Sequence, residues 1–139
     1  MKPFAEYISY LISYSSTVIH SSIKKKFAPY NLAPEQSLIL FVLRLEDGLT
    51  QQEIGEKIKK DKANIARMAE NLEKKGFIER VRDPNNRRAL KLYLTPQGRT
   101  TYNEALTVFE EYDNEVSSRV TAEELREFKR ILCKLTTED

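Results

Sequence analysis

Residues 50–76 predict two short helices in succession, and this pair constrains the fold more than any other part of the chain. Thr50 and Glu53 form a capping box, in which each side chain satisfies a free backbone N–H at the start of a helix. Asp61 can cap the second helix through its carboxylate, which also suits the positive end of the helix dipole. Gly76 is the residue type expected just past a helix end. The sequence therefore predicts two helices joined by a tight corner.

The second of these helices has one apolar and one polar face. Apolar residues recur at the spacing of a single buried stripe, which consists of Ile65, Met68, Ala69 and Leu72. The opposite face carries small residues, amides and charges, namely Lys62, Ala63, Asn64, Ala66, Arg67, Glu70 and Asn71. A helix that enters a DNA major groove needs small residues for close approach, Asn and Arg for base edges and Lys for phosphate. An ordinary helix with a solvated polar face gives the same pattern, so the next segment has to distinguish the two.

The segment that follows predicts a β-hairpin. Residues 90–94 alternate leucine with polar residues, as a half-buried strand does. Residues 77–82 are a plausible partner strand, and residues 83–86, Asp-Pro-Asn-Asn, have the composition of a turn. Arg87 and Arg88 then lie at the tip of the hairpin. A capped helix pair followed by a hairpin is a winged helix-turn-helix, so the predicted fold class is mainly α with a small β-hairpin wing.

Four motifs stand at fixed spacing in this region: Leu-Thr-Gln-Gln-Glu-Ile at 49–54, Leu-Glu-Lys-Lys-Gly-Phe-Ile-Glu-Arg at 72–80, Asp-Pro-Asn-Asn-Arg-Arg at 83–88 and Leu-Thr-Pro-Gln-Gly at 94–98. Together they resemble the DNA-binding domain of the MarR family, the multiple-antibiotic-resistance regulators. A match over about 50 residues is far more specific than one short motif. The helical segments on either side also fit, so the resemblance covers nearly the whole chain.

Length and composition bound the remaining possibilities. A chain of 139 residues indicates one domain, and 40% hydrophobic with 32% charged residues is ordinary for a soluble protein. No apolar run is long enough for a membrane span, and the first residues lack the pattern of a signal peptide. One cysteine and one histidine exclude an internal disulfide and a structural zinc site. These features predict a cytoplasmic protein without a metal or cofactor.

The charge is distributed unevenly. The net charge is only +2, but residues 50–99 carry 13 basic and 7 acidic side chains, whereas residues 100–139 carry 5 and 10. The basic excess coincides with the predicted helix pair and wing. Such a local excess is what a phosphate-binding surface requires, and it favours double-stranded DNA as the partner.

The flanking segments predict long apolar helices. Thr95 is expected to cap a helix that begins at Pro96, and Thr121 with Glu124 forms a capping box for a helix over residues 121–135. These two segments and residues 4–27 each carry apolar residues at helical spacing. They have no core of their own to fill, so their simplest use is to pack against the same helices of a second chain in a two-fold dimer. The whole chain is thus expected to be a single MarR-like domain, with residues 1–30 and 97–139 as the dimerisation region and residues 31–96 as the DNA-binding region.

A two-fold dimer would place two such helices in successive major grooves of an imperfect inverted repeat. Base-edge contacts are assigned to Asn64, Arg67 and Lys62, with Ala63 allowing close approach; phosphate contacts at a helix start are assigned to Thr50, Gln51 and Gln52. The electrostatic contribution is assigned to Lys57, Lys59, Lys60, Arg80 and Arg82, with Lys74 and Lys75 ranked below them. Arg87 or Arg88 would enter the minor groove from the wing.

The wing departs from the family at one position. The resemblance implies an Asp-x-Arg sequence, in which the acid holds the arginine in place, but here the acid is replaced by Asn86 and the arginine is Arg88. An amide accepts a hydrogen bond without the added strength of a carboxylate. The sequence therefore leaves two candidates for the minor-groove contact, Arg88 and Arg87.

The resemblance further implies a repressor relieved by a small, often phenolic, ligand. Candidate pocket residues are Tyr10, Tyr14, His20 and Phe41; the alternative is that the tyrosines are ordinary core or surface aromatics and that His20 is simply partnered or exposed. Some relatives sense oxidants through cysteine, and Cys133 is the one thiol here.

The main alternative is a winged-helix protein-interaction module that has lost DNA binding. The replacement of the wing acid by Asn86 would be consistent with that loss. The basic segment argues against this alternative. An enzyme is not expected, because the chain has no nucleophile elbow, no phosphate-binding glycine loop and no metal-ligand spacing.

Overall fold

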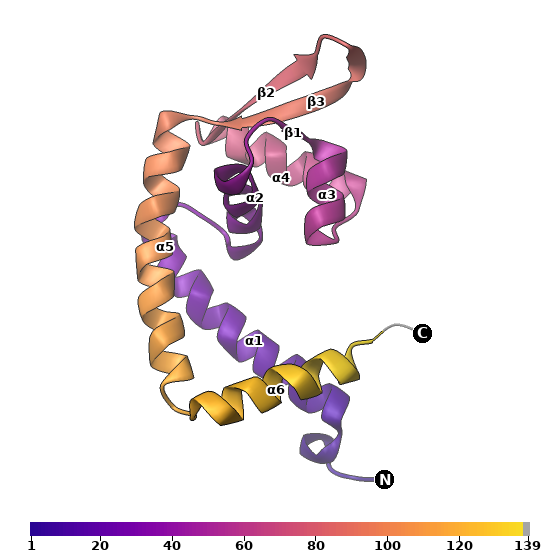
Figure 1. Ribbon diagram of the computed structural model, residues 1–139, viewed down its shortest axis with the longest axis vertical. Helices are drawn as coiled ribbons and strands as arrows, with labels where there is room; N and C mark the ends of the chain where they lie inside the picture. The colour runs from indigo at the N-terminus through magenta and orange to yellow at the C-terminus, as the bar shows by residue number, and fades with distance from the viewer. Residues whose placement is uncertain (138–139) are drawn as a thin grey trace. The chain divides into compact units, whose positions relative to one another are not determined.

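The computed structural model describes residues 1–137, except for the side chain of Arg87. Its helices and strands follow one another as η1 (Phe4–Glu6), α1 (Ile8–Phe27), η2 (Ala28–Tyr30), α2 (Pro34–Leu45), β1 (Leu49–Thr50), α3 (Gln51–Ile58), α4 (Lys62–Lys74), β2 (Ile78–Asp83), β3 (Asn86–Leu94), α5 (Pro96–Ser117) and α6 (Ala122–Leu135) (Figure 1). The chain forms two compact units, of which the first comprises Met1–Leu106 and the second begins at Thr107. The first unit contains the whole predicted winged helix-turn-helix.

The first long helix begins later than predicted. Residues 4–6 form a separate 3₁₀ turn, in which the Glu6 N–H donates to the Pro3 carbonyl at 3.0 Å. Tyr7 is extended (φ −84°, ψ 122°), and α1 starts at Ile8. The prediction of one helix over residues 4–27 was wrong here because the apolar spacing continues across a single extended residue.

Helix α2 starts at Pro34 and buries one of its faces. A helix so rich in apolar residues would be expected to lie in the interior as a scaffold, whereas Leu38, Phe41 and Leu45 are exposed in the single chain. The buried face consists of Gln36, Ile39, Leu40 and Leu43. On a helix that is apolar nearly all round, periodicity does not identify the buried side, so only the tertiary contacts of α2 decide it.

The caps of α3 and α4 are those predicted. The Thr50 hydroxyl accepts the Glu53 N–H at 3.1 Å, and the Glu53 carboxylate accepts the Thr50 N–H at 3.2 Å. The Asp61 carboxylate accepts the Asn64 N–H at 2.8 Å. Between the helices, Lys59 has a left-handed conformation (φ 55°), which turns the chain through the corner. The stripe of Ile65, Met68, Ala69 and Leu72 is fully buried, as predicted.

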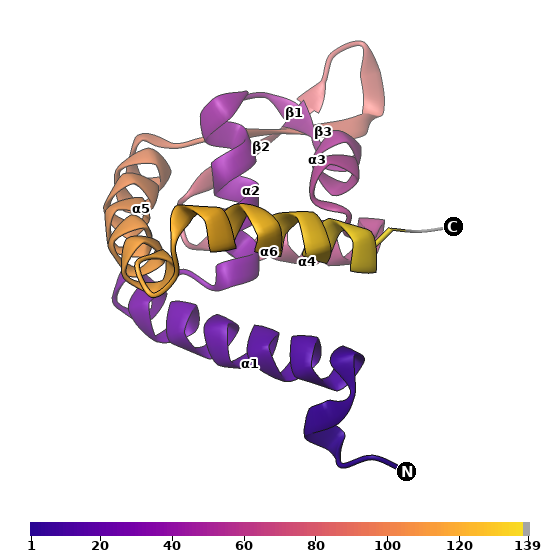
Figure 2. The ribbon, with the colours of Figure 1, turned by 60° about the horizontal axis from the view of Figure 1, so that its bottom comes forward.

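The three strands form an antiparallel sheet in the order β1-β3-β2. The two-residue strand β1 pairs Leu49 with Leu92, so residues 49–50 add a third strand to the β2–β3 hairpin. Strand β3 starts at Asn86, four residues before the alternating segment, because its outer part is exposed and has no apolar face to mark it. The β2–β3 hairpin, which we call the wing, extends past α3 in both ribbon views (Figures 1 and 2).

The wing and α5 meet at a close backbone contact. The Thr95 hydroxyl donates to the Gly76 carbonyl at 2.6 Å and accepts the Gly98 N–H at 2.9 Å, so it caps α5 as predicted. A Cβ atom at Gly98 would lie 1.9 Å from the Phe77 carbonyl oxygen. Only glycine therefore fits at this position.

Helices α1 and α6 expose much of their apolar surface in the single chain. Exposed residues on α1 include Ile8, Leu11, Val18 and Ile19. In the second unit, helix α6 (Figure 2) is capped by Thr121, as predicted. It exposes Phe128, Ile131 and Leu135. None of the helices within residues 1–137 combines the length and apolar character needed to cross a membrane.

The Gly98 contact yields a stability prediction. Gly98→Ala should lower the free energy of unfolding by about 3 kcal/mol, because the new methyl group has to displace the Phe77 carbonyl. Urea unfolding at matched protein concentration measures the effect. Thr100→Ala, at an exposed position of the same helix, is the control and should change the free energy by less than about 0.5 kcal/mol. Equal stability of the two variants would contradict the close contact.

Candidate nucleic-acid interface

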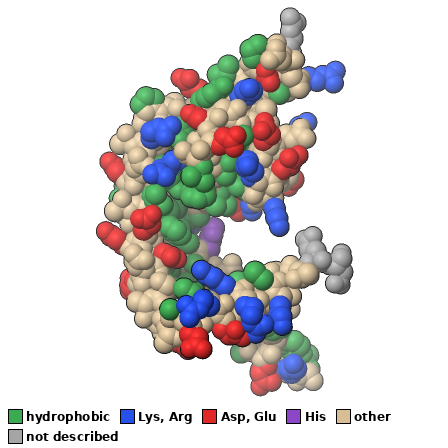
Figure 3. Space-filling model, in the orientation of Figure 1, with side chains coloured by type: hydrophobic (Ala, Val, Ile, Leu, Met, Phe, Trp, Pro, Cys, Tyr) green, Lys and Arg blue, Asp and Glu red, His purple; other side chains and the backbone are tan. Residues whose placement is uncertain are grey.

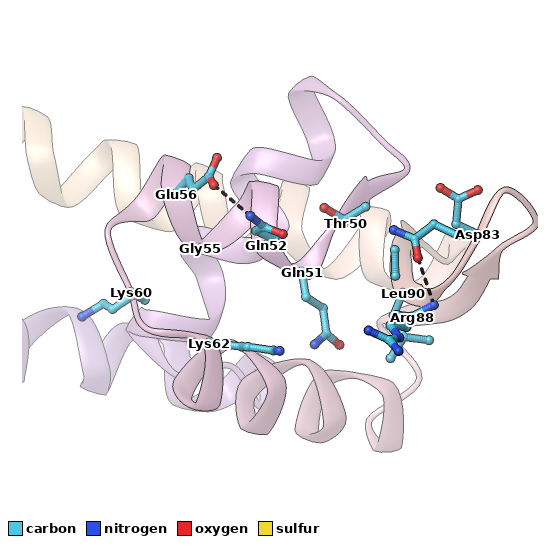
Figure 4. Close-up of a pocket in the computed structure, with 12 residues that line it drawn as sticks. Thr50, Gln51, Gln52, Gly55, Glu56, Lys60, Lys62, Asp83, Arg88 and Leu90 are labelled. Carbon is cyan, nitrogen blue, oxygen red and sulfur yellow. Dashed lines mark hydrogen bonds between the residues drawn. The ribbon is translucent and has the colours of Figure 1, made fainter.

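Helices α3 and α4 and the wing surround an open cleft of about 720 Å³ (Figure 4). Its walls are lined by Thr50, Gln51, Gln52, Gly55, Glu56, Lys60, Lys62, Asp83, Asn86, Arg88, Ala89 and Leu90. The fold thus brings six of the predicted DNA contacts to one place. In the space-filling view, Lys and Arg side chains lie over the region of α3, α4 and the wing, interspersed with acidic ones (Figure 3).

The polar face of α4 carries an internally ordered pair. The Arg67 guanidinium donates to the Asn64 side-chain oxygen at 2.5 Å, while the Asn64 backbone N–H is held by Asp61. Arg67 is exposed and Asn64 is half-buried. The remaining guanidinium N–H groups can donate to guanine O6 and N7, and the Asn64 amide NH₂ can donate to a base acceptor. Lys62 and Ala63 are exposed in the first turn of the same helix.

The polar side chains at the start of α3 have two different uses: some cap the helix, and others face the cleft. The Thr50 hydroxyl accepts one hydrogen bond from Glu53 and donates another to its carboxylate at 3.0 Å, so this side chain is engaged in the cap. Gln52 donates to Glu56 at 3.4 Å within the helix. Gln51 makes no such bond, and its side-chain oxygen is buried without a partner among the described residues. Gln51 and Gln52 therefore have more scope than Thr50 for side-chain contacts with DNA.

The predicted electrostatic residues differ in how the fold uses them. Lys57 and Lys59 are exposed on α3 and at the corner. Lys60 lies 3.8 Å from the Glu35 carboxylate, a surface ion pair that leaves it close to the cleft. Arg82, near the outer end of β2, is engaged in an interaction within the fold.

Arg80 has a structural role that the sequence analysis missed. Its guanidinium donates to Glu73 at 3.0 Å, and its backbone N–H donates to the same carboxylate at 3.2 Å. The hydrogen bond from Arg80 holds the pKa of the Glu73 carboxyl below its ordinary value. This pairing fixes the start of the wing to α4 and argues against the predicted phosphate contact of Arg80.

The side chain of Lys75 likewise makes contacts within the fold. Its ammonium donates to the Asn31 carbonyl and to the Gln36 side-chain oxygen, both at 2.9 Å. Partial burial lowers the pKa of this ammonium. The contact joins the end of α4 to the chain between η2 and α2, and a terminal Lys-Lys-Gly sequence gave no sign of it.

The side chain of Asn86 is bonded to the backbone of the wing. The Asn86 side-chain oxygen accepts the backbone N–H of Arg88 at 3.2 Å, and the Asp83 carboxylate accepts the Asn85 N–H at 2.9 Å. The Arg88 guanidinium lines the cleft (Figure 4). Sequence reasoning missed Asp83 as a cleft residue, although Asp at a turn commonly bonds to the backbone two residues on. The side chain of Arg87 lies outside the part that the structure describes.

The four predicted ligand-binding residues lie away from this cleft. Tyr10 and Tyr14 stack on α1 with ring centroids 6.1 Å apart, and both are exposed. Phe41 faces Tyr102 of α5 at 6.5 Å. His20 and Cys133 are exposed. None of these residues lines the cleft between α3, α4 and the wing.

A capped helix pair followed by a three-stranded sheet and an extended hairpin defines a winged helix-turn-helix protein, and the comparisons agree with this class. The MarR family model matches residues 32–90. The HTH-type transcriptional regulator BilQ of Clostridium symbiosum is 34% identical over 100 residues, which cover 70% of this chain and 69% of BilQ.

Solved structures give the same result. The crystal structure of an S. aureus MepR–DNA complex has a TM-score of 0.86 and 25% identity, covering 93% of this chain and 95% of MepR. A mutant E. coli MarR with operator DNA has a TM-score of 0.88 and 22% identity, covering 99% and 100%, which supports the fold. The chain belongs to the MarR family and is a DNA-binding transcriptional regulator. We therefore call α4 the recognition helix.

The Glu73–Arg80 pair predicts a pH dependence of stability. A carboxyl with a lowered pKa contributes stability that is present above its unfolded-state pKa and is lost as the pH falls through the folded-state pKa. Glu73→Gln should therefore reduce the free energy of unfolding at pH 7 by less than about 1 kcal/mol, since the pair is partly exposed. The difference from wild type should shrink below about pH 4.

Urea unfolding across a pH series measures this difference. Glu70→Gln, which removes the exposed partner of Lys74 on the same helix, is the matched control and should have a smaller effect at pH 7. A Glu73→Gln deficit that stayed constant down to pH 3 would show that the carboxyl charge contributes nothing.

Proposed function

We propose that this protein acts as a homodimer that represses transcription from an imperfect inverted repeat and is released by a small aromatic ligand. The observation that carries the proposal is the hydrogen-bonded Asn64–Arg67 pair on the polar face of the recognition helix, in the same compact unit as the wing residue Arg88. This arrangement supplies base-edge donors and a wing cation from one compact unit. Its site of action would be the cytoplasm, where the operator DNA lies.

Each part of the site would have a separate role on DNA. Arg67 and Asn64 would read base edges in the major groove, with Lys62 at the first turn and Ala63 permitting close approach. Gln51 and Gln52 would approach a phosphate at the start of α3. Lys59 and Lys60 would supply sequence-independent attraction, and Arg88 would enter the minor groove. Operator binding through these groups requires no catalysis, and we propose none.

Dimerisation is supported by the exposed apolar residues of the terminal helices. Phe128, Ile131 and Leu135 are 59%, 42% and 51% exposed and lie on one face of α6. Isolated exposed apolar residues are common on monomers, but an aligned face of this kind marks an interaction site. A two-fold dimer pairs such a face with its copy, and it sets the separation of the two recognition helices.

The ligand would act on that separation. Tyr10, Tyr14, His20 and Phe41 remain the proposed contacts, and the support for them is the exposed Tyr10–Tyr14 stack on α1. A ligand that binds better to a dimer with the wrong helix spacing would shift the population toward that state and release the operator.

Arg67→Ala and Lys59→Ala should separate base contacts from phosphate contacts. Arg67→Ala should weaken binding to the cognate site by about 1–3 kcal/mol and relax the base preference, because it removes the guanidinium donors. Lys59→Ala should weaken binding to all duplexes similarly and reduce the salt slope by about 1. Fluorescence titration over a salt series, with a duplex that the wild type selects from a random-sequence library, measures both.

Lys59 is the matched control because it is exposed and lies at the corner next to the recognition helix. If Lys59→Ala weakened binding only to the selected duplex, the assignment of Lys59 to phosphate contacts and of Arg67 to base contacts would be wrong. A wild-type protein that selected no sequence and showed no salt slope would support the interaction-module alternative.

The dimer proposal predicts that a charge on the apolar face of α6 separates the subunits. Ile131→Glu should weaken the dimer by about 2 kcal/mol or more, because the interface would have to bury an unpaired carboxylate. Sedimentation velocity across a concentration series measures the shift. Arg126→Glu, on the opposite side of the same helix, should leave the dimer intact, and equal behaviour of the two variants would contradict the assigned face.

A further inference from the structure

The cleft contains a hydrogen-bond acceptor without a donor. The side-chain oxygen of Gln51 is buried and has no partner among the described residues. The residue itself is only half-buried, and its backbone neighbours Thr50 and Glu53 complete the helix cap without it. An unmade hydrogen bond on a buried oxygen destabilises the free protein, so such an oxygen points to a partner that arrives later.

The same cleft contains a group of donors without an acceptor. The Arg88 guanidinium forms no hydrogen bond or ion pair with the residues described in the structure; only its backbone N–H is bonded, to the Asn86 side-chain oxygen. Asn86 is therefore not available to hold the guanidinium. Asp83 also lines the cleft, but it accepts the Asn85 N–H and lies beyond ion-pair distance of Arg88.

Gln51 and Arg88 face the cleft from opposite sides. Gln51 is the first residue of α3 and turns its amide into the cleft, and Arg88 reaches into it from β3 (Figure 4). A glutamine oxygen cannot bond to a phosphate, because both are acceptors, so a donor is required. A guanidinium has five N–H donors and can give one to Gln51 while the others face DNA.

We infer that Gln51 is the positioning residue of the wing: its side-chain oxygen accepts a hydrogen bond from the Arg88 guanidinium when DNA closes the cleft. Gln51 thereby does for Arg88 what a wing carboxylate would otherwise do. The contact fixes the wing arginine to the rigid start of α3 rather than to the hairpin itself. This inference rests on the proposed operator binding and assigns a specific role within that site.

A double-mutant cycle tests the inference. The operator affinity of the wild type, Gln51→Met, Arg88→Ala and the double variant is measured on a duplex that the wild type selects from a random-sequence library. Gln51→Met keeps the size of the side chain and removes the acceptor. It should weaken binding by about tenfold alone and by less than about twofold in the Arg88→Ala background. Additive effects, or no effect of Gln51→Met, would overturn the inference.

Two control cycles make the result specific. Gln52→Met changes the neighbouring glutamine, whose amide is bonded to Glu56, and its effect should add to that of Arg88→Ala. Asp83→Asn tests a rival acceptor that lines the same cleft. Coupling of Arg88 to Asp83 but not to Gln51 would overturn the assignment.

A measurement without DNA distinguishes positioning from a structural role. The thermal midpoint of Gln51→Met should be equal to or above that of wild type, because the free protein loses only an unpaired buried oxygen. A lower midpoint would show that the oxygen is already bonded in the folded chain, and it would overturn the inference. If the wild-type protein selects no DNA sequence at all, the proposed function itself is wrong. If it selects a sequence but the effects of Gln51→Met and Arg88→Ala are additive, only the role of Gln51 is wrong.

Discussion

The Thr95 hydroxyl is the contact on which the geometry of the DNA-binding region depends. It forms two hydrogen bonds simultaneously: it donates to the Gly76 carbonyl after the recognition helix, and it accepts the Gly98 N–H in the first turn of α5. The end of α4, the last strand and the long helix are thereby joined at one hydroxyl group. The absence of a side chain at Gly98 lets the backbones approach closely enough for this bond to form.

The parts of the fold that could be predicted from the sequence are those determined within a few residues. The caps at Thr50, Asp61 and Thr121 and the buried stripe of α4 depend on spacing within one helix, and the structure has them as predicted. The core face of α2 could not be predicted, because it depends on which neighbours pack against a helix that is apolar nearly all round.

The candidate site shows the same division. The sequence identifies the polar face of α4, because helix periodicity places Asn64 and Arg67 away from the buried stripe, and the structure joins these two side chains by a hydrogen bond. It does not show which basic side chains the fold itself uses. Arg80 and Lys75 look like surface cations in a local pattern, yet their partners lie 7 and 39 to 44 residues away in the chain. Such pairings are visible only after the chain is folded.

The Lys75 contact has a consequence for how firmly the recognition helix is held. One ammonium joins the end of α4 to two neutral oxygens near the start of α2, and no carboxylate takes part in the contacts seen. Partial burial removes some of the hydration of the ammonium and thereby lowers its pKa, and no ion pair among the described residues replaces that hydration. Two neutral acceptors return only part of that lost hydration. The far end of the recognition helix is thus held to the segment between α1 and α2 by a contact of limited strength, whereas its start is held by the charged cap at Asp61.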